Sequence, residues 1–267
     1  MGRGIAEVAA VAGLDVLIVE ASESQRQAVP IQIRKSIERG VRAGKVSDSV
    51  ERIARRITWS GELDAAATAD FVIEAVPEQE SLKLDVFTRL DRTCPPGTIL
   101  ASNTSSISLT RLASATKRHD RIVGMHFFNP VPVMAPVEIV RAEHTSDETI
   151  SATRQLAEHI GKQAFVVRDR PGFVVNRVLM PLINEAAIAL SEGVADAATI
   201  DSLMKLGCNH PMGPLRLADL IGLDVCLSIL DVLYHELGEK FRPCQRLAEL
   251  VKAGKLGRKT DEGFYKY

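Results

Sequence analysis

A histidine and a glutamate stand twelve positions apart in an otherwise apolar segment. The stretch GMHFFNPVPVMAPVEIV, residues 124–140, holds His126 and Glu138 among apolar residues, prolines and one asparagine. A buried carboxylate that lacks a partner is costly and becomes protonated instead. If Pro130 and Pro132 turn the chain back, the imidazole and the carboxylate meet in an apolar setting. The carboxylate would then fix the tautomer of the ring and make it a better proton acceptor, as general base catalysis requires.

The same two residues also fit a purely structural pair, with His126 as a core histidine and Glu138 as a carboxylate at a strand edge. Two other segments favour the catalytic interpretation. ASNTSS spans residues 101–106 after an apolar run, and PGFVVNR spans residues 171–177. Both place small hydroxyl or amide groups at the ends of elements, where binding and catalytic groups tend to lie.

The first twenty residues have the pattern of the second half of a dinucleotide-binding βαβ unit. Apolar spacing over residues 5–12 predicts a helix, Gly13 ends it, and residues 15–19 predict a short strand that ends at Glu20. An acid at this point accepts hydrogen bonds from the adenosine ribose. It would repel a 2′-phosphate, which favours NAD over NADP. The alternative is a solvated charge at a strand end.

The glycines at the start of the chain have two interpretations. In a full unit, a strand and a G-x-G-x-x-G turn precede the helix and let the backbone approach the pyrophosphate. Gly2 and Gly4 either open such a fingerprint, or Gly2 is the last glycine of one that begins earlier.

The elements that must position these residues alternate as far as Asp169. Strands are expected at residues 71–76, 98–101, 122–126, 137–140 and 164–167, and helices at 22–57 with a break at Pro30, 81–94, 108–115 and 149–160. Such alternation predicts a mainly parallel, doubly wound sheet. Beyond Asp169 the pattern is only helical, with helices expected at 174–193, 196–206, 215–237 and 245–253. The sequence therefore predicts an α/β domain over residues 1–168 and an all-α domain over residues 169–267.

The composition is that of an ordinary globular protein. The 267 residues are 46% hydrophobic and 25% charged, with a net charge of −1, so no basic excess points to a nucleic acid. No apolar run is long enough to suggest a membrane span. The four cysteines have no metal-site spacing and no disulfide framework, which predicts a reducing, cytoplasmic setting without a structural metal.

Several strings in a fixed order make the whole chain resemble the L-3-hydroxyacyl-CoA dehydrogenases of the bacterial 3-hydroxybutyryl-CoA type. They are ASNTSS, HFFNPVPVM followed by VE, PGFVVNR, MGP with LADLIGLD, and the terminal LGRKTDEGFYKY. The resemblance implies a Rossmann-like domain followed by a helical one. It also implies an oxidoreductase that interconverts (S)-3-hydroxyacyl-CoA and 3-oxoacyl-CoA with NAD in fatty acid β-oxidation, and a homodimer formed through the helical domain.

Carried over by position, the resemblance implies a role for each matching residue. His126 would be the general base that removes the proton of the 3-hydroxyl group, and Glu138 would orient it. Ser105 and Asn176 would hydrogen-bond the substrate near the reacting oxygen. The residues expected around NAD are Gly2, Glu20, Glu78, Lys83, Ser105, Asn129 and Lys259. The residues expected near coenzyme A are Ser36, Arg42 and Lys45, with Ser36 placed by spacing alone.

The sequence departs from the family pattern at its N-terminus. Relatives begin with a strand and a G-x-G-T-M-G turn, and this sequence begins at the M-G. Either the start codon lies too far downstream, or the strand is truly lost. Because that strand would be central in the sheet, we expect the chain as printed to bind NAD weakly and to be poorly stable.

Two rival functions remain open at the level of the sequence. One is a dehydrogenase of the same architecture that acts on a hydroxy acid without coenzyme A, such as a carnitine or sugar-acid dehydrogenase. The other is a catalytically weak or inactive relative that keeps the fold.

Overall fold

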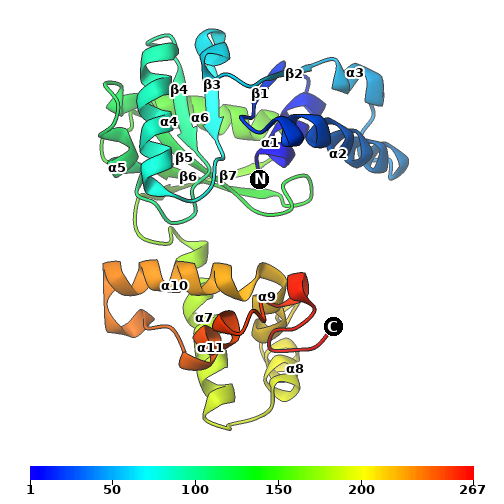
Figure 1. Cartoon of the computed structure of the whole chain (residues 1–267), viewed down its shortest axis with the longest axis vertical. Helices are drawn as coiled ribbons and strands as arrows, with labels where there is room; N and C mark the ends of the chain where they lie inside the picture. Colours follow the sequence, from blue (N-terminus) through cyan, green and yellow to red (C-terminus); the bar gives the residue numbers. More distant parts are fainter. The chain divides into compact units, whose positions relative to one another are not determined.

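The computed structural model describes all residues from 1 to 267 and divides into two compact units, residues 1–169 and 170–267. The division lies one residue beyond the predicted boundary. Figure 1 shows that the strands belong to the first unit and that the second unit is built of helices.

The first unit contains a two-stranded and a five-stranded sheet. The strands are β1 (Val16–Val19), β2 (Ile57–Ser60), β3 (Phe71–Glu74), β4 (Ile99–Ser102), β5 (Ile122–Phe127), β6 (Pro136–Arg141) and β7 (Gln163–Arg168). The helices are α1 (Gly2–Val11), α2 (Glu23–Arg42), α3 (Val50–Ala54), α4 (Glu80–Thr93), α5 (Leu109–Ala113) and α6 (Asp147–His159), with 3-10 turns at η1 (Leu63–Thr68) and η2 (His119–Arg121).

The sheet differs in two ways from the single, mainly parallel sheet that the sequence predicted. β1 pairs with β2 in a separate ribbon, whereas the larger sheet has the order β3-β4-β5-β6-β7. All pairs are parallel except β5 with β6, which is antiparallel. An antiparallel pair can be joined by a short loop, and here residues 128–135 join the two strands. We call residues 128–135 the β5–β6 loop.

The structure differs from the prediction for residues 22–60 in three ways. The predicted helix is interrupted at residues 43–49, between α2 and α3. The helix does not break at Pro30: α2 continues through it, because Ile33 and Ile37 are buried and hold the helix on its core. The strand β2 was missed because four residues are too few for a clear period-2 signal. Its Ile57 and Trp59 pack with α2 and α3, so tertiary burial determines this strand.

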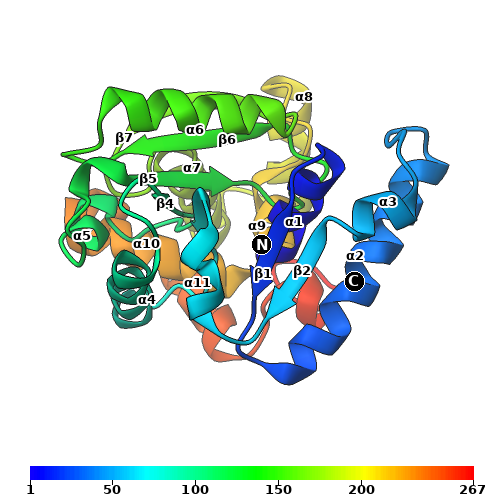
Figure 2. The same cartoon turned by 90° about the horizontal axis from the view of Figure 1, so that it is seen from above.

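One face of the five-stranded sheet is covered by α1 and α6 (Figure 2). Met125 of β5 and Ile139 of β6 point into this core, where they meet Ile5 of α1 and Ile150 of α6. Successive strand side chains point to opposite faces. His126 and Glu138 therefore lie on the opposite face of the sheet.

The second unit is helical throughout. Its helices are α7 (Val175–Ser191), α8 (Ala197–Gly207), α9 (Pro214–Ile221), α10 (Leu223–Leu237) and α11 (Gln245–Lys252), with 3-10 turns at η3 (Glu239–Phe241) and η4 (Arg258–Thr260). The single helix expected at 215–237 is two helices. Gly222, at φ +105°, separates α9 from α10 in a conformation that L side chains rarely adopt.

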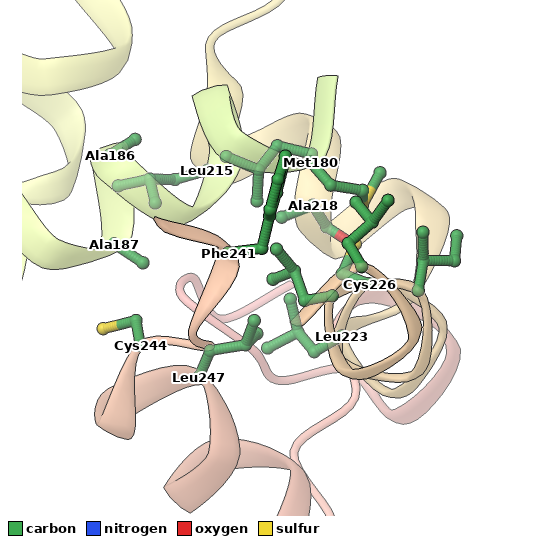
Figure 3. Packing of buried hydrophobic residues seen from close by; sticks show 14 residues of the cluster. Met180, Ala186, Ala187, Leu215, Ala218, Leu223, Cys226, Phe241, Cys244 and Leu247 are labelled. Carbon is green, nitrogen blue, oxygen red and sulfur yellow. The ribbon is translucent and has the colours of Figure 1, made fainter. Parts of the chain in front are cut away.

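The core of the second unit joins α7, α9, α10 and α11. In Figure 3, Met180, Leu215, Leu223 and Phe241 converge from different segments on one apolar centre. Asp219 of α9 binds the C-terminal segment, residues 264–267, to this core. Its carboxylate accepts hydrogen bonds from three donors of that segment, at 2.9, 2.9 and 3.0 Å: Phe264 N, Tyr265 N and the Tyr267 hydroxyl.

Two kinds of feature are absent from the structure. No helix combines the length and the apolar character needed to cross a bilayer. No three or more His, Cys, Asp or Glu side chains are grouped so that they could hold a metal ion.

Removing the buried Asp219 carboxylate tests how the C-terminal segment is held. We expect Asp219→Ala to lower the free energy of unfolding by about 3 kcal/mol, because it removes a buried acceptor that holds three hydrogen bonds of the C-terminal residues. Urea unfolding followed by circular dichroism measures the change. Asp224→Ala is the matched control, since it breaks a half-exposed ion pair with Lys259 that is worth less than about 1 kcal/mol. Equal losses for the two variants would contradict this account.

Candidate active site

His126 and Glu138 form a buried pair across the β5–β6 ladder. The antiparallel register places them directly opposite each other, and His126 Nδ1 lies 2.7 Å from Glu138 Oε2. Both residues are less than a tenth exposed. The sequence predicted that the two prolines would turn the chain back and bring these groups together, and the structure confirms this pairing. With Nδ1 on the carboxylate, Nε2 is the ring nitrogen that can take a proton from a substrate.

The β5–β6 loop begins beside this pair. The ring of Phe128 lies 4.9 Å from the imidazole of His126, centroid to centroid. Asn129 follows in the loop and is exposed. Asn103, at the end of β4, accepts a hydrogen bond at 3.0 Å from the backbone N–H of Phe127. The ends of β4 and β5 are therefore tied together at the start of the loop.

Glu78 organises the segment that carries Ser105. One oxygen, Glu78 Oε1, accepts from the Thr104 hydroxyl, from the backbone N–H groups of Ser105 and Ser106 at 2.9 and 3.0 Å, and from the Ser106 hydroxyl at 3.0 Å. The Ser105 hydroxyl lies 3.4 Å from the same oxygen. The ASNTSS string thus folds around a carboxylate that comes from the end of β3. Ser105 and Glu78, expected in one site, lie together.

A buried lysine joins Glu78 to the interior. Lys83 Nζ lies 2.7 Å from Glu74 and 3.3 Å from Glu78, and the side chains of Lys83 and Glu74 are each 1% exposed. Glu74 also accepts a hydrogen bond at 2.6 Å from the Ser102 hydroxyl. Lys83 was expected beside NAD. Its ammonium is fully enclosed between two carboxylates, so we expect it to influence a cofactor through Glu78.

The pKa of Glu78 reflects these contacts. Burial would raise the pKa of this carboxyl. The hydrogen bond from Thr104, the charge of Lys83 and the hydrogen bonds from Ser105 and Ser106 together lower the pKa below its usual value of 4.5. Glu78 is therefore held in its ionised form.

The start of α1 and the end of β1 fit a dinucleotide. The first turn of α1 has no acidic residue and no side-chain cap, so its N–H groups and dipole are suited to a pyrophosphate. A Cβ on Gly2 would lie 3.4 Å from that of Ala75, and one on Gly4 would lie 3.0 Å from that of Val131. The helix therefore begins in close contact with the end of β3 and the β5–β6 loop. Glu20 follows β1 directly, as a ribose ligand would. These residues fit NAD.

The residues expected near coenzyme A lie in and just after α2. Ser36 is half-buried and lies close to Glu7 of α1. Burial raises the pKa of the Glu7 carboxyl, and Ser36 lowers this pKa by a smaller amount. Arg42 and Lys45 are exposed at the C-terminal end of the helix. Of the three residues expected near coenzyme A, Arg42 and Lys45 are therefore exposed cations, whereas Ser36 faces a neighbouring helix.

Two of the expected site residues belong to the second unit. Asn176 lies in the first turn of α7 and is 8% exposed. Lys259 lies in η4 and forms an ion pair with Asp224 of α10.

Three residues of the site were not assigned from the sequence. Glu74 and Ser102 form the buried end of the Lys83 network, and Asn103 ties β4 to β5. Asn103 and Ser102 stand in the ASNTSS string, which was a usable signal. Glu74 had no such signal, and one of its two side-chain partners, Ser102, is 28 positions away.

Neutralising Glu78 tests whether its charge holds the Ser105 segment. A carboxyl group with a lowered native pKa stabilises the fold at pH values above its unfolded value, and this contribution is lost as the pH falls through the native pKa. We expect Glu78→Gln to lose about 1–2 kcal/mol at neutral pH. The difference from wild type should shrink in acid below 4.5. Denaturant unfolding at a series of pH values measures it, and the exposed Glu143→Gln serves as control. A difference independent of pH would contradict this role.

Comparisons with known proteins match both units. Residues 1–170 match the family model described as 3-hydroxyacyl-CoA dehydrogenase, NAD binding domain, and residues 172–267 match 3-hydroxyacyl-CoA dehydrogenase, C-terminal domain. A probable 3-hydroxybutyryl-CoA dehydrogenase of Bacillus subtilis is 51% identical over 269 residues, which cover 100% of this chain and 94% of the relative. The mitochondrial hydroxyacyl-coenzyme A dehydrogenase of Sus scrofa is 40% identical over 283 residues, covering 100% and 88%.

A solved structure is similar over the same length. The (S)-3-hydroxybutyryl-CoA dehydrogenase PaaH1 from Ralstonia eutropha has a TM-score of 0.96 and 47% identity, and the match covers 100% of this chain and 95% of that one. Both units and the full length of the chain thus agree with one family. The chain belongs to the 3-hydroxyacyl-CoA dehydrogenase family, with an NAD-binding domain followed by the family's C-terminal domain.

Proposed function

We propose that the chain oxidises (S)-3-hydroxyacyl-CoA, with 3-hydroxybutyryl-CoA as the expected substrate, to 3-oxoacyl-CoA. The single observation that carries the proposal is the buried pair of His126 Nδ1 and Glu138 at 2.7 Å. A relative that is 51% identical and a solved structure that is 47% identical both have 3-hydroxybutyryl-CoA dehydrogenase in their names, which supports the choice of substrate. Within metabolism, this reaction is a step of fatty acid β-oxidation. The free cysteines fit a reducing compartment, for which we propose the cytoplasm.

In this proposal, His126 removes the proton of the 3-hydroxyl group through Nε2. The proton makes the ring an imidazolium, and the Glu138 carboxylate on Nδ1 stabilises that charge while it keeps the ring oriented. NAD, when bound, supplies the acceptor for the hydride that leaves C3. The first turn of α1, Glu20, Asn129 and Glu78 would hold NAD.

Two further groups would hold the reacting oxygen. Ser105 is placed by the Glu78 contacts, and Asn176 lies at the start of α7. Hydrogen-bond donors at this oxygen stabilise charge that develops as the proton leaves. Arg42 and Lys45 would meet the phosphates of coenzyme A, because both are exposed cations.

The helical unit has a surface suited to a second copy of the chain. On α8, Leu203 and Leu206 are 63% and 86% exposed and share one helix face, and Val194 before the helix is 71% exposed. Exposed apolar patches of this kind mark interaction sites. We propose that this face forms a homodimer contact.

Substitution of the catalytic pair tests the proposed reaction directly. His126→Ala should lower kcat for 3-hydroxybutyryl-CoA by about a thousandfold, since general base catalysis contributes between 10² and 10⁴. Glu138→Gln keeps an acceptor but not the charge, so we expect a smaller fall in kcat with KM for the acyl-CoA unchanged. The appearance of NADH measures both. His144→Ala, which changes an exposed histidine stacked on His119, is the control. Wild-type rates in His126→Ala would refute the assignment.

A charge on the α8 face tests the dimer. The wild-type chain should have twice its mass of 29.1 kDa in light scattering, and Leu206→Asp should have the monomer mass. The reason is that a carboxylate buried in an apolar contact is costly. Ile31→Asp, at an exposed site on α2, should remain dimeric. A dimeric Leu206→Asp would place the contact elsewhere.

A further inference from the structure

Lys162 is a buried cation that the proposed reaction does not use. Its side chain belongs to a residue only 7% exposed, and it forms no salt bridge. Instead, Nζ donates to two backbone carbonyl oxygens of the β5–β6 loop, Val131 O at 2.5 Å and Met134 O at 2.8 Å. Burial lowers the pKa of this ammonium group. Burying an ammonium group without a carboxylate partner costs free energy. The two hydrogen bonds to carbonyl oxygens offset this cost, and because the donor is charged they are stronger than hydrogen bonds between neutral groups.

Backbone hydrogen bonds on both sides of Lys162 fix the position of its Cα, and with it the region that the ammonium group can reach. Gly161, at φ +74°, ends the α6 segment, and the N–H of Lys162 returns to Ala157 O at 2.8 Å. The next residue, Gln163, donates its N–H to Ala135 O at 2.9 Å. Two consecutive residues therefore bind three carbonyl groups of the β5–β6 loop.

The other side of the loop packs against the start of α1. Val131 is 2% exposed and lies in the same core cluster as Ile5. A Cβ on Gly4 would come within 3.0 Å of the Val131 Cβ, so the α1 backbone at Gly4 packs directly against the side chain of Val131 in the loop. Asn129 precedes Val131 by two positions. The position of the loop thus determines both what borders the first turn of α1 and where Asn129 stands.

We propose that Lys162 is a positioning residue for NAD, because its ammonium group clamps the β5–β6 loop against α1 and holds Asn129 in place. The inference rests on the proposed function, which assigns Asn129 and α1 to the cofactor. His126 and Glu138 are held by the β5–β6 ladder itself. Loss of the clamp therefore affects cofactor binding and leaves the catalytic pair in place.

The test is Lys162→Met, which keeps the length of the side chain and removes its donors. We expect the Kd for NADH, measured by fluorescence titration, to rise about tenfold. We also expect faster hydrogen exchange at the Val133 and Met134 amides, which close the turn of the loop on Pro130 O. The pH profile of kcat, which reports His126, should remain that of the wild type. Lys117→Met removes an exposed lysine of the same unit and is the control.

The outcomes separate the clamp from a general structural role. Lys162→Gln keeps one amide donor, so its NADH affinity and loop exchange should lie between those of the wild type and Lys162→Met. If Lys162→Met melts at a lower temperature but has wild-type NADH affinity and wild-type exchange in the loop, the proposal is overturned. A wild-type chain that failed to bind NADH would count against the proposed function, and the exchange measurements would still decide whether Lys162 fixes the loop.

Discussion

The candidate active site depends on one contact between a ring nitrogen and a carboxylate across two antiparallel strands. An imidazole in an apolar setting is useful as a base only if its orientation and tautomer are fixed. The register that places His126 opposite Glu138 achieves this with backbone hydrogen bonds, since β5 and β6 hold both side chains on the same face. The helices α1 and α6 cover the opposite face of the sheet, and the ends of other strands bring further groups to its edge.

Several of these groups follow the carboxyl ends of parallel strands. Glu20 follows β1, Glu78 follows β3 and Ser105 follows β4, and in open α/β sheets ligands bind at this edge. The edge is supported from within by a buried network of Glu74, Lys83 and the Glu78 carboxylate. Charges that are buried in this way require partners, so the network specifies one arrangement of the Ser105 segment.

The sequence allowed a prediction wherever the signal was local. The His126 and Glu138 pair could be predicted because the two residues are close in sequence and separated by turn-forming prolines. The alternation of strands and helices indicated the α/β unit for the same reason. The features that were missed depend on distant partners. Pro30 is tolerated because α2 is held by its core, and β2 exists because β1 pairs with it.

The tautomer of His126 tests the central contact most directly. Nitrogen-15 NMR of the neutral ring, with the wild type and Glu138→Gln compared, distinguishes a proton on Nδ1 from one on Nε2. This account predicts that Nδ1 carries the proton, hydrogen-bonded to the carboxylate, and that Nε2 is the basic nitrogen. A neutral ring protonated at Nε2, with shifts that do not change in Glu138→Gln, would contradict it.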